Sequence, residues 1–433
     1  MKEKIKNIAK TTYAYSFAAK AVHISLGLIG TIFINRYLGA ELKGEYAYII
    51  NILNISFTIF NLGIYQSYPF NKRQGMKNIK NKYVNLMIKQ SLVYFIIGLI
   101  IIPLIAIILP NGADNVLIIS ISYMYLILNI LSHQLSMVAS VETFKKKSKA
   151  LIISELTQFI LLGFMFVFLN KNILVPIIIG IIYYTVYIIL CMQYLNVKIK
   201  LKEHDVEFAK KTLKMGIFPT LFTLFLSLNY RLDIIFLKQY TNTPAVSLAD
   251  VGLYSVGVQL AQYIWLIPDI FKEVLFNKTS RKDSIREILY CSKISILISL
   301  LFLIFILVFG DTLIIALYGN EYAGAVNITK IIFIGVISMC IFKVLNPLYN
   351  AKGKFFENFI ILFISILINV ILNFILIPLY GSIGAAIASV IGYVVCSIVY
   401  LFRFMKEYKI KIWQVILINR QDIKDINKYL GKK

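Results

Sequence analysis

Apolar segments of about twenty residues recur along almost the whole chain, and they constrain its fold more than any other feature. A helix needs about 20 mostly apolar residues to cross the hydrocarbon core of a bilayer. Hydrophobic residues make up 59% of the sequence and charged residues 15%, which leaves more apolar surface than a soluble core can bury. The sequence therefore predicts an all-α integral membrane protein with twelve transmembrane helices, at 13–35, 45–67, 84–109, 115–141, 150–170, 173–197, 216–238, 251–275, 289–310, 325–348, 358–378 and 384–405.

Basic residues are concentrated in alternate loops between these segments. With the N-terminus in the cytoplasm, the cytoplasmic stretches hold 34 Lys and Arg, and the outer loops hold 4. Positively charged loops are retained on the cytoplasmic side of a bacterial inner membrane. We therefore expect a multi-pass protein of the bacterial cytoplasmic membrane with both termini in the cytoplasm. The net charge of +24 then reflects the loops, and nucleic acid is not an expected partner.

A short pattern repeats at half the chain length. A Gly-x-Tyr-small sequence opens the second and eighth apolar segments, at 44–47 and 252–255, and both segments end in Phe-Asn-Lys. Six helices separate the copies, so both keep one orientation, as in a parallel repeat about an axis along the membrane normal. We predict two pseudo-twofold-related six-helix lobes with these bounds: N-terminal lobe 1–197, cytoplasmic connector 198–215, C-terminal lobe 216–405 and basic cytoplasmic tail 406–433.

Four motifs, in this order along nearly the whole chain, resemble a known transporter family. They are Asn35-Arg36-Tyr37-Leu38-Gly39 with Gly44-Glu45-Tyr46; Arg231-Leu232-Asp233 with Val251-Gly252-Leu253-Tyr254; Leu317-Tyr318-Gly319-Asn320-Glu321-Tyr322; and Asn369-x3-Asn373 with Pro378-Leu379-Tyr380-Gly381. This pattern is similar to the polysaccharide transporter family, the Wzx-type O-antigen and capsule flippases of the multidrug/oligosaccharidyl-lipid/polysaccharide exporter superfamily.

The resemblance implies an alternating-access transporter with a central cavity between its two lobes. Its substrate would be an undecaprenyl-diphosphate-linked oligosaccharide repeat unit, moved from the cytoplasmic to the outer leaflet for O-antigen, capsule or exopolysaccharide synthesis. Membrane lipids and other polysaccharide-assembly proteins would be its further partners. The twelve predicted helices differ from the fourteen of the related lipid II flippases, so we do not expect the lipid groove that their extra pair forms.

Cations inside the spans are the candidate ligands of the substrate diphosphate. Charged side chains are costly at the membrane centre and usually face a cavity or a partner. Lys20 and Arg231 lie on the leading helices of the two predicted lobes, and Arg36 belongs to the first family motif. Arginine would offer bidentate contacts and lysine a point charge. The alternatives are that Lys20 and Arg231 snorkel to the membrane interfaces, that Arg231 pairs with an acid, and that Arg36 anchors the outer loop.

Two carboxylates are candidates for coupling transport to an ion. Glu155 lies five residues into the fifth predicted span and could work against Lys20, while Asp233 lies in the outer half of the seventh. Asp233 is two residues from Arg231, about 200° around a helix, so we expect it to meet another helix or the interface. The alternative for Glu155 is a structural ion pair or a position at the membrane interface.

Polar amides inside the spans are candidates for binding sugar hydroxyls. Asn54, Asn61 and Asn229 are the candidate cavity residues, although hydrogen bonds between helices explain them equally well. Asn369 and Asn373, at i and i+4, share one helix face, for which we favour helix packing.

The competing functions are another class of transporter and a membrane enzyme. A drug or cation antiporter of the same superfamily would prefer an acidic cavity. A polymerase or acyltransferase is disfavoured by the short outer loops and by the lack of a His/Asp/Glu constellation. The four cysteines form no metal motif and no phosphate-binding glycine loop is present, so we expect no enzyme activity, cofactor or metal site.

Overall fold

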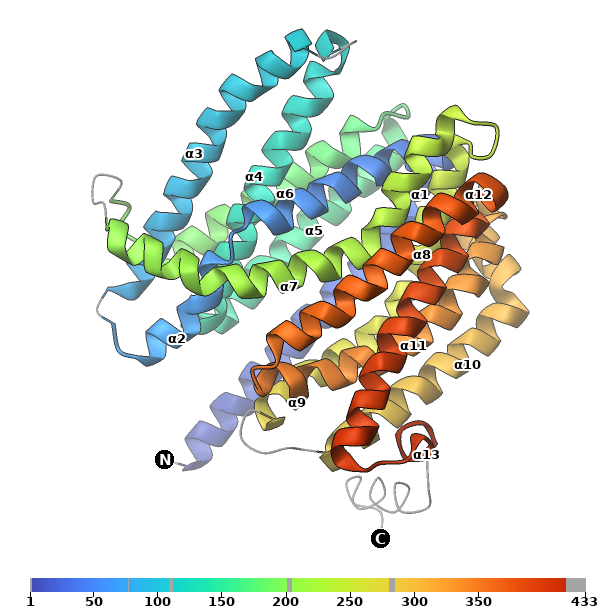
Figure 1. Cartoon of the computed structure of the whole chain (residues 1–433). Helices are drawn as coiled ribbons and strands as arrows, with labels where there is room; N and C mark the ends of the chain where they lie inside the picture. The colour runs from blue at the N-terminus through green and yellow to red at the C-terminus, as the bar shows by residue number, and fades with distance from the viewer. Residues whose placement is uncertain (1, 77, 109–111, 201–204, 280–284, 418–433) are drawn as a thin grey trace. The chain divides into compact units, whose positions relative to one another are not determined.

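The computed structural model describes residues 2–76, 78–108, 112–200, 205–279 and 285–417, and for 2–20 and a few other helical residues it describes the backbone alone. All regular structure in these residues is helical (Figure 1). The helices of the first half are α1 (Lys2–Phe60), η1 (Ile64–Ser67), α2 (Tyr68–Arg73), α3 (Ile79–Ile108), α4 (Gly112–Glu142), α5 (Phe144–Phe168), α6 (Leu174–Leu195) and α7 (Val206–Gln239). Those of the second half are η2 (Tyr240–Asn242), α8 (Leu248–Gln262), η3 (Tyr263–Trp265), α9 (Leu266–Thr279), α10 (Ile285–Tyr318), η4 (Asn320–Tyr322), α11 (Ala325–Ala351), α12 (Phe355–Tyr408) and α13 (Ile412–Ile416).

Nine helices in these described ranges are long and apolar enough to cross a membrane. Two of them, α1 and α12, each hold two of the predicted segments, and each contains one glycine with non-helical dihedral angles. These glycines are Gly39, at φ 71° and ψ 175°, and Gly381, at φ 55° and ψ −133°. Both belong to the family motifs, and positive φ is the region that glycine tolerates best.

The turn at Gly381 folds α12 back on itself (Figure 1). Ser365, before the turn, donates a 2.8 Å hydrogen bond to the carbonyl of Gly392, after it. A Cβ atom at position 381 would lie 2.8 Å from the carbonyl oxygen of Ala245, so the packing also favours glycine here. The two halves of α12 therefore lie side by side, as two predicted spans joined by a tight turn would.

The chain divides into two compact units: unit 1 comprises 1–42 and 49–224, and unit 2 comprises 43–48 and 225–433. The division falls within α7, whereas the sequence places the lobe boundary in the connector 198–215. The first part of α7 belongs to unit 1 because Gly216 packs against the chain at Leu62 and Gly63, where an added Cβ on Gly216 would lie 2.6 Å from the Leu62 carbonyl. Of the predicted tail 406–433, residues 418–433 lie outside the described part of the chain.

In unit 1, α4 packs against α3, α5 and α6. Its core continues into η1 and α2, where Tyr68 and Tyr83 are buried against each other in an edge-to-face arrangement. Two residues of the Phe-Asn-Lys motif stabilise the junction between α2 and α3. Asn71 donates to the Tyr83 hydroxyl, and Lys72 pairs with Glu142 at 2.6 Å. The motif at the end of the second predicted segment therefore stabilises the corner where the chain enters α3.

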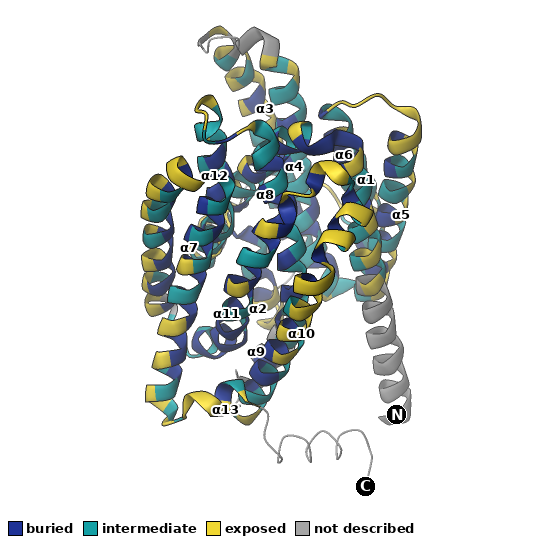
Figure 2. Ribbon diagram, turned by 90° about the vertical axis from the view of Figure 1, so that its right-hand side faces the viewer, coloured by how far each residue is buried: buried dark blue, intermediate teal, exposed yellow. Residues whose placement is uncertain are grey.

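In unit 2, α11 is the central helix. It packs against α8, α9, α10 and α12 and is buried along most of its length (Figure 2). By contrast, α10 exposes a row of large apolar side chains, including Leu301, Phe305 and Val308. A helix with an apolar exposed face is expected where lipid, rather than water, surrounds the protein.

Two predicted spans, 45–67 and 251–275, are broken in the structure rather than continuous. The first ends as a helix at Phe60, after which Leu62 and Gly63 take positive φ before η1 begins. The second ends at Gln262 and passes through η3 before α9 begins. The expectation of unbroken helices is wrong at these points because apolar character continues through the breaks and hides them.

Candidate functional site

The helix break of unit 1 is surrounded by polar side chains. A helix end leaves its last carbonyl groups without partners inside the helix. Here Phe60 O accepts from Gln90 at 2.8 Å and from the Tyr94 hydroxyl at 2.8 Å, and Asn61 O accepts from Gln134 at 3.1 Å. The side chain of Asn61 bonds to Gln134 at 2.9 Å and lies 3.4 Å from His133 Nδ1. The candidate sugar ligand Asn61 is thus engaged in capping the break.

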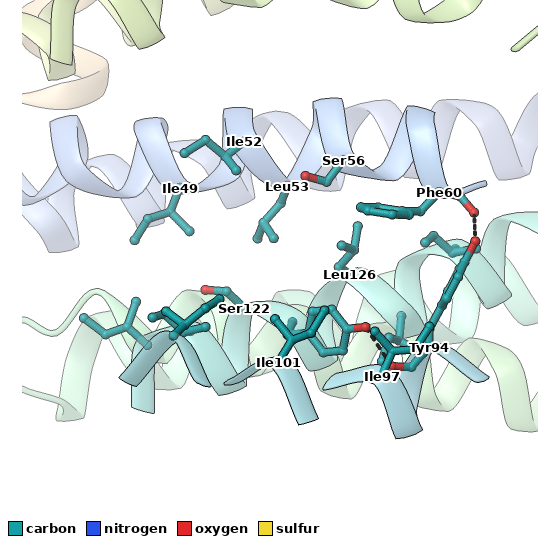
Figure 3. Close-up of a pocket in the computed structure, with 16 residues that line it drawn as sticks. Ile49, Ile52, Leu53, Ser56, Phe60, Tyr94, Ile97, Ile101, Ser122 and Leu126 are labelled. Atoms are coloured by element: carbon teal, nitrogen blue, oxygen red, sulfur yellow. Dashed lines mark hydrogen bonds between the residues drawn. The ribbon is translucent and has the colours of Figure 1, made fainter. Parts of the chain in front are cut away.

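An apolar pocket of about 450 Å³ adjoins this break (Figure 3). It lies between the second part of α1, α3 and α4, and aliphatic side chains such as Leu53, Ile97 and Leu126 line it. Its polar edge is formed by Tyr94, whose hydroxyl donates to Phe60 O and whose carbonyl accepts from the Tyr123 hydroxyl at 2.7 Å. The pocket is suited to hydrocarbon chains and offers little to a charged ligand.

Glu155 is buried in unit 1 and pairs with a histidine. Glu155 Oε1 lies 2.5 Å from His23 Nδ1, and the Glu155 side chain is 5% exposed whereas that of His23 is 53% exposed. Tyr183 of α6 also lies beside the carboxylate. The sequence named Lys20 as a partner of Glu155, but the Lys20 side chain lies outside the described residues. His23, one helical turn after Lys20, is a partner that sequence reasoning missed.

Asp233 is the most extensively hydrogen-bonded carboxylate among the described residues. It is 2% exposed, and each of its oxygens accepts two hydrogen bonds. Asn369 and Asn373 donate to Oδ1 at 2.9 and 2.7 Å, while Tyr254, at 2.9 Å, and Ser389 donate to Oδ2. Charges buried in a protein require such partners. The structure thus places Asp233 against α8 and both halves of α12.

The four donors to Asp233 come together because of local sequence features. Asn369 and Asn373 share one face of α12 through their i, i+4 spacing. Asn373 and Ser389 lie on opposite sides of the turn at Gly381 and equally far from it, so the turn brings them to the same depth. Tyr254 comes from the Gly-x-Tyr motif that opens the eighth predicted segment. Two of the four family motifs, the second with Asp233 and Tyr254 and the fourth with Asn369 and Asn373, therefore meet at this carboxylate.

The other predicted ligands are placed separately. Arg231 is half-buried in unit 2 near Tyr393, and Arg36 is exposed in unit 1. Asn229 donates to Ser365 at 2.8 Å and so joins α7 to α12, while Asn54 is half-buried and its carbonyl accepts from Thr58. These positions leave the roles proposed for Arg231, Arg36 and Asn54 as predictions.

A further ion pair was missed in the sequence. Lys343 Nζ lies 2.9 and 3.0 Å from the two oxygens of Asp269 and 4.8 Å from the centre of the Trp265 ring. The Trp265 indole in turn donates to Val336 O at 3.0 Å. Asp269 lies in the first turn of α9, so an acid inside the predicted span 251–275 was the available signal.

Within the described residues, no group of three or more His, Cys, Asp or Glu side chains is arranged to hold a metal ion.

Comparisons with known proteins decide the family. A family model described as "Polysaccharide biosynthesis protein" matches residues 11–276, more than half of the chain. The chain belongs to the polysaccharide biosynthesis protein family. The resemblance inferred from the four motifs is thereby confirmed. A search of curated protein sequences finds no match.

Solved structures show the same fold as this family member. An inward-facing multidrug resistance MATE transporter of the MOP superfamily is similar with a TM-score of 0.68 at 14% identity, over 89% of this chain and 94% of that one. The lipid II flippase MurJ, in an inward closed conformation, gives a TM-score of 0.62 at 18% identity, over 97% of this chain and 93% of that one. The Vibrio cholerae MATE transporter VcmN, as its D35N mutant, gives 0.63 at 14% identity, over 94% and 99%.

These findings establish the class of the protein. It is a multi-pass integral membrane protein of the polysaccharide biosynthesis protein family, and its all-α fold is similar to that of MATE transporters and of the lipid II flippase MurJ. The prediction of an all-α membrane protein is confirmed, whereas the count of twelve helices and their division into two six-helix lobes stay predictions.

Proposed function

We propose that the protein is a flippase that moves undecaprenyl-diphosphate-linked oligosaccharide repeat units across the bacterial cytoplasmic membrane. The match of the polysaccharide biosynthesis family model to residues 11–276 carries this proposal. In it, twelve helices form two pseudo-twofold-related six-helix lobes that alternate access between the two leaflets. Both termini lie in the cytoplasm, because the loops on that side hold most of the Lys and Arg residues.

The proposed phosphate ligands are Lys20, Arg231 and Arg36. A diphosphate carries two or more negative charges, and cations in a partly desolvated environment bind it through charge-assisted hydrogen bonds. Arg231 is half-buried two residues from Asp233, so the anchoring of Asp233 by α8 and α12 also fixes the backbone that carries the guanidinium group. Asn54 is half-buried and is the remaining amide candidate for sugar hydroxyls.

Ion coupling is proposed at one of two carboxylates. Glu155 is buried beside the imidazole of His23, and a pair of ionisable side chains within the membrane-spanning helices is typical of an ion-coupling site. Asp233 is enclosed by four donors and links three helical segments, which suits a group that senses the conformation of unit 2. We assign coupling to the Glu155–His23 pair first and retain Asp233 as the second candidate.

A drug or cation antiporter is the second candidate function, because two of the similar folds are MATE transporters. An antiporter of cationic substrates requires acidic side chains in its binding site, whereas the candidate binding residues here include the cations Lys20, Arg231 and Arg36. Drug sensitivity of an expressing strain, compared with a strain carrying the empty vector, separates the two functions. The flippase account expects equal sensitivity.

The experiment that tests the proposal is complementation of a strain that lacks its own repeat-unit flippase. Expression of the protein in its native genetic background should restore surface polysaccharide and remove the lipid-linked intermediate that accumulates in the inner leaflet. Arg231→Ala and Lys20→Ala should reduce this restoration at normal protein level. Surface polysaccharide that is independent of the protein would contradict the proposed function, and unchanged export by both variants would contradict the ligand assignment alone.

A further inference from the structure

Unit 1 contains a second cavity, which is polar and is separate from the apolar pocket and from the candidate residues described above. It has a volume of about 420 Å³ and lies between the first turns of α3 and the side chains of Lys200, Asp205 and Phe208. Amides, lysines and one phenylalanine form most of its walls, and Leu86 and Asp205 complete them. On the predicted topology, this cavity opens on the cytoplasmic side, where a lipid-linked sugar is made available to the transporter.

The amide wall is formed by Asn78, Asn81 and Asn85. Asn85 is held in place by the facing chain, because its Nδ2 donates to Lys198 O at 3.2 Å and its Oδ1 accepts from the Lys200 backbone N–H at 2.8 Å. By contrast, Asn81 Oδ1 is buried without a hydrogen-bond partner. A buried acceptor without a partner is costly, and a hydroxyl group of a bound sugar would satisfy it.

The cationic wall is formed by Lys82, Lys89 and Lys200. Lys82 and Lys89 are seven residues apart and so lie on one face of α3. Lys82 Nζ is 2.7 Å from Asp205 Oδ2, and this hydrogen bond holds the pKa of Asp205 below its ordinary value. One carboxylate against three lysines leaves the cavity with a positive charge that suits a phosphate group.

The aromatic side chain is Phe208, in the first turn of α7. Its ring packs edge-to-face on Tyr83 and lies 5.5 Å from Lys82 Nζ. The same ring also borders an adjoining cavity of about 400 Å³, where Lys211 and Glu207 add opposite charges. Sugars bind through hydroxyl groups to amides and through their C–H faces to aromatic rings, so the cavity matches a sugar next to a phosphate.

We propose that this cavity binds the phosphorylated sugar headgroup of a lipid-linked saccharide before transport. The inference rests on the proposed function, but it concerns a separate site on the loading side. In it, the Asn78, Asn81 and Asn85 amides contact the sugar, while Lys89 and Lys200 contact the phosphate. A phospholipid headgroup would share the phosphate contacts and would make no use of the amide wall.

The test measures binding to the full-length protein in nanodiscs of phosphatidylcholine. The probe is a synthetic short-chain lipid-linked sugar, farnesyl diphosphoryl N-acetylglucosamine. Lys89→Gln should weaken its binding about tenfold and Asn81→Ala about fivefold, as loss of a charged and of a neutral hydrogen bond implies. Lys89→Arg keeps the charge and should bind within about twofold of wild type. Lys214→Gln is the matched control, because Lys214 is exposed on α7 and lines neither cavity.

The possible results distinguish a saccharide site from a lipid-headgroup site and from a failure of the proposed function. Unchanged affinity of Lys89→Gln and Asn81→Ala, with an unchanged melting temperature, would overturn the site while leaving the proposed function intact. In nanodiscs of phosphatidylglycerol, displacement of the probe together with no effect of Asn81→Ala would assign the cavity to lipid headgroups and also overturn the inference. Failure of the wild-type protein to bind the probe at all would contradict the proposed function itself.

Discussion

The helix break of unit 1 predicts that Gly63 and Gly75 differ sharply in their tolerance of alanine. Both glycines have positive φ, 62° at Gly63 and 74° at Gly75. An alanine in this region of backbone space costs roughly 1–2 kcal/mol. A Cβ at Gly63 would also lie 2.5 Å from Thr220 Oγ1 and 2.7 Å from Gly216 O, whereas a Cβ at Gly75 has no heavy atom within 4 Å.

The clash at Gly63 adds the cost of overpacking, about 1–3 kcal/mol, because a backbone carbonyl of α7 must move. Gly63→Ala should therefore lower the free energy of unfolding by about 2–5 kcal/mol and Gly75→Ala by about 1–2 kcal/mol. Both values are measured by denaturant unfolding in detergent micelles, with tryptophan fluorescence and circular dichroism as probes. Equal losses for the two variants would refute the close packing of the break on α7.

Three further predictions concern polar groups. Asp233→Ala removes the acceptor that four buried donors share; Asn373 keeps its bonds to Asn369, and the Tyr254 and Ser389 hydroxyls, 3.2 Å apart, can bond to each other. The substitution should cost about 1–3 kcal/mol for each donor left without a partner, and Asp233→Asn should cost less; unfolding in detergent measures both, and equal losses would contradict the hydrogen-bond network. Lys343→Met should cost about 1–2 kcal/mol through loss of the partly exposed Asp269 pair and the ring contact, and a neutral result in the same assay would show that the pair contributes no stability. Since the pKa of Asp205 is depressed in the folded protein, its contribution to stability is present above the ordinary carboxylate pKa and is lost as pH falls through the folded value. Melting curves at several acidic pH values should therefore show a smaller pH dependence for Asp205→Asn, and identical curves would contradict the Lys82 contact.

The sequence predicted the fold class because apolar length and loop charge are local quantities. Runs of twenty apolar residues identify spans whatever their neighbours are. The breaks after Phe60 and Gln262 were not predicted, because their residues remain apolar while only the backbone changes direction. Gly63 was the available signal in the first break, although a single glycine is common within transmembrane helices.

In the candidate sites, too, the sequence predicted only what depends on spacing within one helix. The i, i+4 spacing of Asn369 and Asn373 predicted a shared face, and the 200° separation of Asp233 from Arg231 predicted contact with another helix; the structure shows both arrangements. Partners that are far apart in the sequence were not predictable, as with His23 and Glu155 or Lys343 and Asp269. Such pairs depend on how helices pack, which periodicity within one helix does not specify.

The most direct test of the proposed function is transport by the purified protein in vesicles. Proteoliposomes containing a fluorescent undecaprenyl-diphosphate-linked oligosaccharide in both leaflets would be treated with an impermeant reagent that destroys only outward-facing sugar. The account predicts that vesicles with the protein lose the inner-leaflet fraction as well, and that Arg231→Ala slows this loss. Protection of the inner fraction equal to that in protein-free vesicles, under an imposed ion gradient of either direction, would contradict it.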